Sequence, residues 1–150
     1  VQSYPRPPAL EPVPQRIVIR LGGVVVADPT TAMRVLETHH APTYYLPPDA
    51  FPPGLLRPAS GGSLCEWKGR AAYFDVIGRD GPLLRAAWAY PVPTPVFRPL
   101  AGHVALYLSS RLRGWIGDIE AAPQPGGFYG GWVTPNLSGR IKGAPGTEHW

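Results

Sequence analysis

Glycine and proline set the strongest limit on how this chain can fold. Of its 150 residues, 18 are glycine and 21 are proline. Together they make up about a quarter of the chain, a share that reaches the range of disordered proteins. Five Trp, seven Tyr and four Phe argue against disorder, because large aromatic side chains are costly to leave in water. We therefore expect a folded core with much irregular loop, and the length fits one domain.

Alternating apolar residues predict a mainly β fold. Ile17 and Ile19 fall on one face of an early strand, and the two glycines that follow it are typical of a hairpin turn. Phe74 and Val76 share one face of the clearest central strand, and we expect that face in the core. Strands are expected over residues 16–21, 24–27, 43–46, 70–77, 83–90, 103–109 and 112–116, a turn over 79–82 and a loop with one helical turn over 47–62.

One short helix is expected from Asp28 to residues 37–39. Asp28 can cap it, and Pro29 suits the first helical position because its missing N–H costs nothing there. Ala32 and Val35 have the spacing of a buried helical face.

Three segments differ in composition. Residues 1–15 hold five prolines, which favour an extended and unpaired N-terminal arm. Residues 16–120 carry the alternating patterns and are expected to form the domain itself. Residues 121–150 are rich in glycine and aromatic residues, and we expect them to pack on the domain as a lid or as a cover for an edge strand.

Charge and cysteine content exclude several classes of site. A single cysteine, Cys65, allows neither an internal disulfide nor a zinc site built on cysteine pairs. The net charge is +4, but the arginines are scattered, so no nucleic-acid partner is expected. No run reaches the roughly 18 apolar residues of a membrane span, and the N-terminus lacks a signal pattern. We therefore expect a soluble cytoplasmic protein with no membrane contact, metal or cofactor.

Four segments concentrate polar and aromatic residues outside a simple core pattern: residues 37–47, 65–73, 87–91 and parts of the tail from 128 to 150. Four motifs occur in or beside the first three segments: Arg34-Val35-Leu36-Glu37, Tyr44-Tyr45-Leu46-Pro47, Cys65-Glu66-Trp67-Lys68-Gly69 with Ala71 and Tyr73, and Ala87-Trp88-Ala89-Tyr90 with Pro93. In this order they resemble the signature of domain-of-unknown-function family 427, which is also filed as a nucleotidyltransferase family. The resemblance covers about residues 16–120, and Phe128-Tyr129-Gly130-Gly131-Trp132 in the tail resembles one subgroup of that family.

The resemblance implies a β-tent fold, in which two antiparallel sheets lean together. This fold is similar to methionine sulfoxide reductase type B and to the thalidomide-binding domain of cereblon, which holds its ligand in an aromatic cage. Those relatives usually carry a four-cysteine zinc site, which one cysteine cannot supply, so packing alone would hold this tent. The chain also lacks a Walker motif and an Asp-x-Asp pair, so its own residues do not support nucleotide transfer.

Glu37 and Lys68 are the candidate polar pair. Glu37 can act as a base or accept a ligand's hydrogen bond, and Lys68 can present an ammonium group, whereas a salt bridge or a solvated lysine is the structural alternative. Cys65 can act as a nucleophile with His39 or His40 as its base, although a lone cysteine is more often a small buried hydrophobe. Neighbouring residues on a helix point about 100° apart, so the histidine pair is not expected to hold a metal ion.

Aromatic residues from several segments are the candidate lining of a pocket. Trp88 and Tyr90 share a face of one strand, and Tyr73 shares its face with a small alanine that leaves room above it. Aromatics on a half-open sheet can hold a cation or a flat ring, and plain core packing is the alternative. The predicted ligand-binding set is Glu37, His40, Tyr44, Tyr45, Trp67, Lys68, Tyr73, Trp88 and Tyr90.

The sequence therefore favours a domain that binds a small molecule in an aromatic-lined pocket with a Glu–Lys polar pair. Two alternatives stay open. One is an enzyme that uses Glu37 and Lys68 for acid–base chemistry, and the other is a protein-interaction module that uses the proline-rich arm.

Overall fold

The computed structural model describes residues 4, 8–65, 68–125, 129–137 and 144. Within them the chain forms thirteen strands and two short 3-10 helices, which confirms the prediction of a mainly β fold. No helix in this part of the chain is long and apolar enough to cross a membrane. The elements are β1 (Ala9–Pro12), β2 (Ile17–Leu21), β3 (Val24–Ala27), β4 (Met33–Leu36), β5 (Thr43–Tyr45), η1 (Pro48–Ala50), β6 (Leu56–Cys65), β7 (Gly69–Gly78), β8 (Gly81–Ala89), η2 (Pro95–Leu100), β9 (Val104–Leu106), β10 (Leu112–Ile116), β11 (Ile119–Glu120), β12 (Ala122–Pro123) and β13 (Trp132–Val133).

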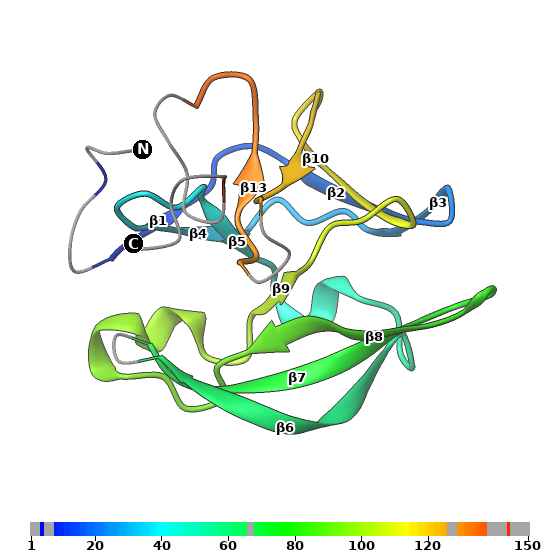
Figure 1. Cartoon of the computed structure of the whole chain (residues 1–150), viewed down its shortest axis with the longest axis horizontal. Coiled ribbons are helices and arrows are strands. Elements are labelled where there is room, and N and C mark those ends of the chain that lie inside the picture. The colour runs from blue at the N-terminus through cyan, green and yellow to red at the C-terminus, as the bar shows by residue number, and fades with distance from the viewer. Residues whose placement is uncertain (1–3, 5–7, 66–67, 126–128, 138–143, 145–150) are drawn as a thin grey trace.

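The strands form two layers (Figure 1). The first layer is the antiparallel sheet β6-β7-β8-β9, and the second contains the sheets β1-β4-β5 and β11-β10-β2-β3. Strand β9 runs toward the second layer, and a bridge between Val104 and Leu46 connects it to the end of β5. A two-stranded pair, β12-β13, brings part of the tail beside these strands. Two leaning antiparallel layers are compatible with a β-tent.

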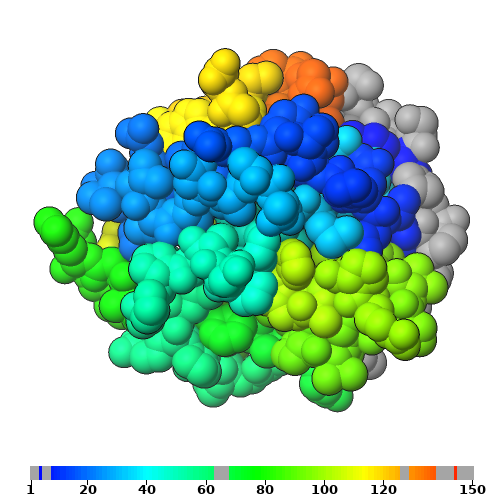
Figure 2. All heavy atoms as spheres, turned by 180° about the vertical axis from the view of Figure 1, so that it is seen from behind, coloured from blue at the N-terminus to red at the C-terminus, as the bar shows by residue number. Residues whose placement is uncertain are grey.

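The predicted hairpins are confirmed. Strands β2 and β3 pair through Gly22 and Gly23, whose φ angles of 58° and 84° lie in the region that a tight hairpin turn needs. Strands β7 and β8 form the second hairpin, with Gly78 opposite Gly81, and its tip extends beyond the rest of the molecule (Figures 1 and 2).

The predicted helix after Asp28 is wrong, because Met33–Leu36 forms strand β4. This strand lies between β1 and β5, with Val35 opposite Leu10 on one side and Thr43 on the other. Val35 is buried, as the pattern predicted, but from an extended backbone. Two flanking strands supply backbone hydrogen bonds to β4, and this tertiary pairing outweighs the local helical spacing.

Two other expectations need correction. Residues 9–12 of the N-terminal arm pair with β4 as strand β1, so the arm is not unpaired there. Residues 56–62 belong to β6 and not to a loop over 47–62. Pro58 and the glycines after it looked like loop signals, but a register shift between Pro58 and Gly62 lets the strand absorb them. The helical turn expected near Asp49 is present as η1.

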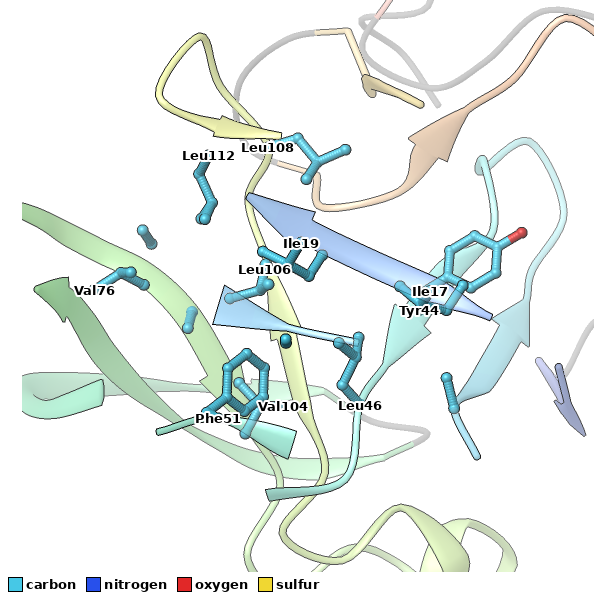
Figure 3. Packing of buried hydrophobic residues seen from close by; sticks show 14 of the residues in the cluster. Ile17, Ile19, Tyr44, Leu46, Phe51, Val76, Val104, Leu106, Leu108 and Leu112 are labelled. Atoms are coloured by element: carbon cyan, nitrogen blue, oxygen red, sulfur yellow. The ribbon is translucent and has the colours of Figure 1, made fainter. Parts of the chain in front are cut away.

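Two clusters of buried apolar residues fill the fold. The larger gathers Ile17 and Ile19 of β2, Leu112 of β10 and Val76 of β7 (Figure 3). Phe74 packs against the same cluster, which confirms the predicted core face of the central strand. The smaller cluster is mostly aromatic and consists of Val35, Tyr45, Ala71, Trp88, Tyr90, Phe97, Leu100 and Ala105.

Trp132 anchors the tail in the larger cluster. The residue is 1% exposed, and its Nε1 donates a hydrogen bond to the Leu106 carbonyl at 3.3 Å. Its backbone N–H donates to the Pro42 carbonyl at 2.8 Å. The indole lies against Gly114 of β10, where a Cβ atom would come within 3.0 Å of the ring. This part of the tail therefore belongs to the core instead of covering it.

Candidate functional site

A bulge in the β7–β8 hairpin shapes the first part of the site. Three residues of β8, from Leu84 to Ala86, face the single residue Asp75 of β7, because the register shifts between Phe74 and Val76. Arg85, in the middle of the bulge, has a φ of 51°, a left-handed conformation that is uncommon outside glycine. Its backbone N–H donates to Asp75 Oδ1 at 2.8 Å. The bulge thus redirects the Arg85 side chain.

The redirected Arg85 side chain is held over an aromatic ring. Its Cζ lies 4.2 Å from the centre of the Tyr73 ring, which is cation–π distance. Its Nη1 donates to the Ser60 carbonyl at 2.7 Å. These two contacts therefore hold the guanidinium over Tyr73 of β7, in a lining that also includes Tyr107 at the end of β9.

A pocket of about 480 Å3 lies next to this arginine, and we call it the tyrosine pocket. The bulge, the end of β9 and the tail each contribute one side. Its volume falls in the range of small-molecule sites. The lining residues are Tyr73, Leu83, Leu84, Arg85, Ala86, Tyr107, Leu108, Ser109, Pro123, Gln124, Tyr129, Gly130 and Gly131.

Tyr107 supplies a hydroxyl group that stays protonated. Burial raises the pKa of Tyr107 to about 12, a hydrogen bond with Tyr73 acts in the same direction, and the charge of Arg85 opposes both. Behind this residue, the Tyr107 ring centre lies 4.5 Å from that of Trp88. The pocket wall is thus backed by the aromatic cluster of the core.

Two glycines allow the tail to close the pocket. A Cβ atom on Gly130 would overlap the distal ring carbons of Trp88, so only glycine fits there. A Cβ atom on Gly131 would lie 2.5 Å from the Ala41 carbonyl, and the Gly131 carbonyl accepts a hydrogen bond from the Gln124 N–H at 2.9 Å. Gln124 is 2% exposed although it is polar.

The predicted polar residues form a second group beside the pocket, which we call the polar cluster. Lys68 Nζ lies 3.8 Å from Glu37 Oε1, and His40 Nε2 lies 3.6 Å from Glu37 Oε2. A turn brings Glu37 and His40 together, because the His40 N–H donates to the Glu37 carbonyl at 3.0 Å and His39 has a φ of 65°. Lys68 is 9% exposed, with Nζ 6.0 Å from the centre of the Tyr90 ring.

His40 joins the polar cluster to the tail wall of the pocket. Its Nδ1 lies 3.4 Å from Gln124 Nε2, so the amide can donate to an unprotonated ring nitrogen. Its ring meets the Tyr129 ring edge-on at 5.1 Å. Because Gln124 and Tyr129 both line the pocket, the cluster supports that wall from behind.

The structure distributes the predicted site residues over three places. Tyr73 lines the tyrosine pocket, and Glu37, His40 and Lys68 make up the polar cluster. The aromatic cluster of the core contains Tyr45, Trp88 and Tyr90, with the Tyr45 ring centre 6.3 Å from each of the other two.

Tyr44 and Trp67 are the remaining members of the predicted set. Tyr44 points to the other cluster, its ring centre 5.0 Å from that of Trp132. Burial raises the pKa of Tyr44, and a hydrogen bond with Arg34 opposes that shift. Trp67 lies outside the described residues. Cys65, weighed as a nucleophile, ends β6 opposite Gly69.

Sequence reasoning missed Arg85, Tyr107 and Gln124. Arg85 reaches the pocket because the bulge redirects its side chain, and no local sequence pattern predicts that bulge. Tyr107 continues the alternation of β9 and carried a weak signal as an aromatic at a strand end. Gln124 sits in a segment without periodicity, where no signal was available. Two further cavities, of about 450 and 240 Å3, are lined by other residues, Arg70 and Arg79 among them.

Within the described ranges, no three His, Cys, Asp or Glu side chains gather closely enough to hold a metal ion. The polar cluster provides only Glu37 and His40 of these types.

Comparison with known protein families identifies the group to which this fold belongs. Residues 9–117 match a domain of unknown function, DUF427, filed under the name NTP_transf_9. No curated protein matches the chain. The tail residues that line the tyrosine pocket, Pro123, Gln124 and residues 129–131, lie beyond the matched segment. The match spans most of the chain and confirms the resemblance seen in its motifs, so the protein is a member of the DUF427 family.

Proposed function

We propose that this domain binds a small organic molecule in the tyrosine pocket. The observation that carries the proposal is a pocket of about 480 Å3 that is lined by three tyrosines, Tyr73, Tyr107 and Tyr129, and by Arg85, whose guanidinium lies over the Tyr73 ring. Small-molecule sites typically combine an apolar and aromatic lining with a few placed polar groups. Three leucines, Leu83, Leu84 and Leu108, supply the apolar share here.

The backbone at Arg85 supports the proposal. A left-handed conformation costs a non-glycine residue about 1 kcal/mol or more, and such residues cluster at binding sites. The bulge that holds Arg85 in this conformation also places its side chain on the pocket wall. A purely structural hairpin needs neither feature.

The proposal assigns the polar cluster a supporting role. Glu37 and Lys68 do not line the pocket, but Glu37 pairs with His40, which contacts Gln124 and Tyr129. We infer that the cluster holds these two wall residues in position. The Glu–Lys pair expected to contact the ligand would then act through His40.

A fragment screen followed by mapping tests the proposed function. The 15N-labelled protein is mixed with a library of one-ring and two-ring compounds, and backbone amide shifts are followed by NMR. We expect the binding compounds to shift the amides of Ala86, Leu108 and Gly130, which line the pocket, and to leave Val25 and Ile119 unchanged. Ser109→Phe, which adds bulk at an exposed residue of the pocket lining, should abolish these shifts, whereas Ala122→Phe, at an exposed alanine outside the lining, should not. Shifts that map elsewhere, or none at all, would refute the proposal.

The convergence of three titratable side chains favours a second candidate function, acid–base chemistry at the polar cluster. Lys68 and His40 both lie within 4 Å of the Glu37 carboxylate. An enzyme of this kind would lose its turnover in Glu37→Gln while keeping its fold. A panel of hydrolase and isomerase substrates, run with both proteins, tests the idea, and a rate that is equal in the two proteins excludes it.

A further inference from the structure

We propose that the ligand of the tyrosine pocket is an organic oxyanion, with an apolar ring as its body and a carboxylate or phosphate group that binds Arg85. This inference rests on the proposed function and adds the chemical class of the ligand. It follows from the charge, the donors and the walls of the pocket.

The charge of the pocket comes from Arg85. It is the charged residue among the thirteen that line the cavity. No ion pair joins Arg85 to a carboxylate in the part of the chain that the structure describes. Asp75 accepts the Arg85 backbone N–H, and its carboxylate pairs with Arg57 at 3.7 Å. The pocket therefore presents an uncompensated positive group, which favours an anion over a cation.

The geometry of Arg85 suits an oxyanion. A guanidinium carries five N–H donors in a planar fork that matches carboxylate or phosphate oxygens. The Ser60 carbonyl accepts from Nη1, and the Tyr73 ring fixes the plane of the fork. Because contacts on the protein already orient this side chain, little rotational freedom remains to be lost when an anion binds.

One hydroxyl group adds a donor in the same pocket. Ser109 Oγ accepts the Leu112 N–H at 3.2 Å, which leaves its own hydrogen to donate. Tyr107 also lines the pocket, but its hydroxyl is hydrogen-bonded with Tyr73. Arg85 and Ser109 are therefore the side-chain donors that we expect an anion to use.

The remaining walls suit a ring. Leu83, Leu108 and Pro123 are apolar, and Tyr107 and Tyr129 are aromatic. A flat apolar body between such walls removes apolar surface from water without demanding hydrogen bonds. An anion without a ring would leave this surface exposed, so an amphipathic anion fits better than an inorganic one.

A matched set of naphthyl compounds tests the inference by isothermal titration calorimetry on the full chain. The probes are 2-naphthoate, 2-naphthyl phosphate, the neutral 2-naphthamide and the cationic 2-naphthylmethylamine. We expect at least one of the two anions to bind about tenfold more tightly than the amide, the gain typical of one charge-assisted contact. The amine should bind most weakly. Comparison of carboxylate with phosphate identifies the preferred oxyanion.

Arg85→Asn is the informative variant, because asparagine also adopts the left-handed backbone and so retains the bulge. It should abolish the preference for the anion over the amide. Arg98→Gln removes an exposed arginine of η2 that does not line the pocket, and it should leave every affinity unchanged. Melting temperatures of both variants verify that they fold.

The possible failures can be distinguished. If the amide maps to the pocket by NMR and binds as tightly as both anions, the inference is wrong while the proposed function stands. The same holds if Arg85→Asn keeps the preference for anions. If the anions bind but shift amides remote from Ala86 and Leu108, the inference is wrong. These compounds then also give no support to the proposed function, because they bind outside the tyrosine pocket.

Discussion

Gly114→Ala tests how firmly the tail is seated in the core. A Cβ atom at this position would lie 3.0 and 3.1 Å from two distal ring carbons of Trp132 and 3.2 Å from Leu108 Cδ2. Ordinary carbon contacts begin near about 3.5 Å, so each neighbour would have to move by a few tenths of an ångström. Trp132 has little room for this, because it is buried and its Nε1 is hydrogen-bonded to Leu106.

The expected size of the effect follows from two opposing contributions. Overpacking of a filled core costs about 1–3 kcal/mol. Replacing glycine by alanine, where no positive φ is involved, stabilises the fold by about 0.4–1 kcal/mol, because alanine lowers the conformational entropy of the unfolded chain. We therefore expect a net loss of about 1 kcal/mol, which lowers the melting temperature by roughly 2–4 °C for a chain of this size.

A double-mutant cycle makes the prediction specific. Phenylalanine lacks the distal ring carbons of tryptophan, so Trp132→Phe removes the atoms that the added methyl group would meet. In that background Gly114→Ala should become neutral or stabilising, with a coupling of about 1–2 kcal/mol between the two changes. The free energy of unfolding is measured by urea denaturation of the four proteins. Additive effects would show that the indole does not press on Gly114.

Three further predictions concern titratable groups. The raised pKa of Tyr107 disfavours its ionised form in the folded protein, so the free energy of unfolding should fall as pH rises from about 10 to about 12. Tyr107→Phe should reduce this fall when denaturation is measured across that pH range. The hydrogen bond from Arg113 lowers the pKa of Glu120, so the advantage of wild type over Glu120→Gln should be present at neutral pH and disappear as acid protonates Glu120. In a double-mutant cycle measured by denaturation, Lys68→Met and Glu37→Gln should show a coupling energy of about 0.5–1 kcal/mol. Additive effects would show that the two side chains do not interact.

The strands with strong alternation could be predicted from the sequence. Ile17 and Ile19 were expected to share one face of a strand, which forms as β2, and the Phe74–Val76 face of β7 was expected in the core and packs there. Strand β4 could not be predicted, because its apolar spacing fits a helix equally well and the deciding hydrogen bonds come from residues far along the chain. The first part of β6 could not be predicted either, because its proline and glycines are typical of a loop and a register shift accommodates them in the strand.

Site residues could be predicted only where they belong to a recognisable sequence motif. Glu37, Lys68 and His40 are part of the set predicted from the motifs, and the structure places Lys68 and His40 each within 4 Å of the Glu37 carboxylate. Arg85 could not be predicted as a site residue, because its position depends on a bulge that places two extra residues of β8 opposite β7. The tail wall depends on Gln124, which is buried and whose N–H donates to the carbonyl of Gly131, the residue before Trp132.

The position of the tail relative to the family-matched segment has a consequence for how binding specificity can evolve. The matched residues supply the scaffold and Arg85, while the opposite wall of the pocket comes from a segment appended after it. Within that segment Trp132 and Gly131 are constrained by packing, but Pro123 and Tyr129 are not buried in the core. Under the proposed function, ligand preference can therefore change through substitutions at these positions, while the charged anchor stays constant.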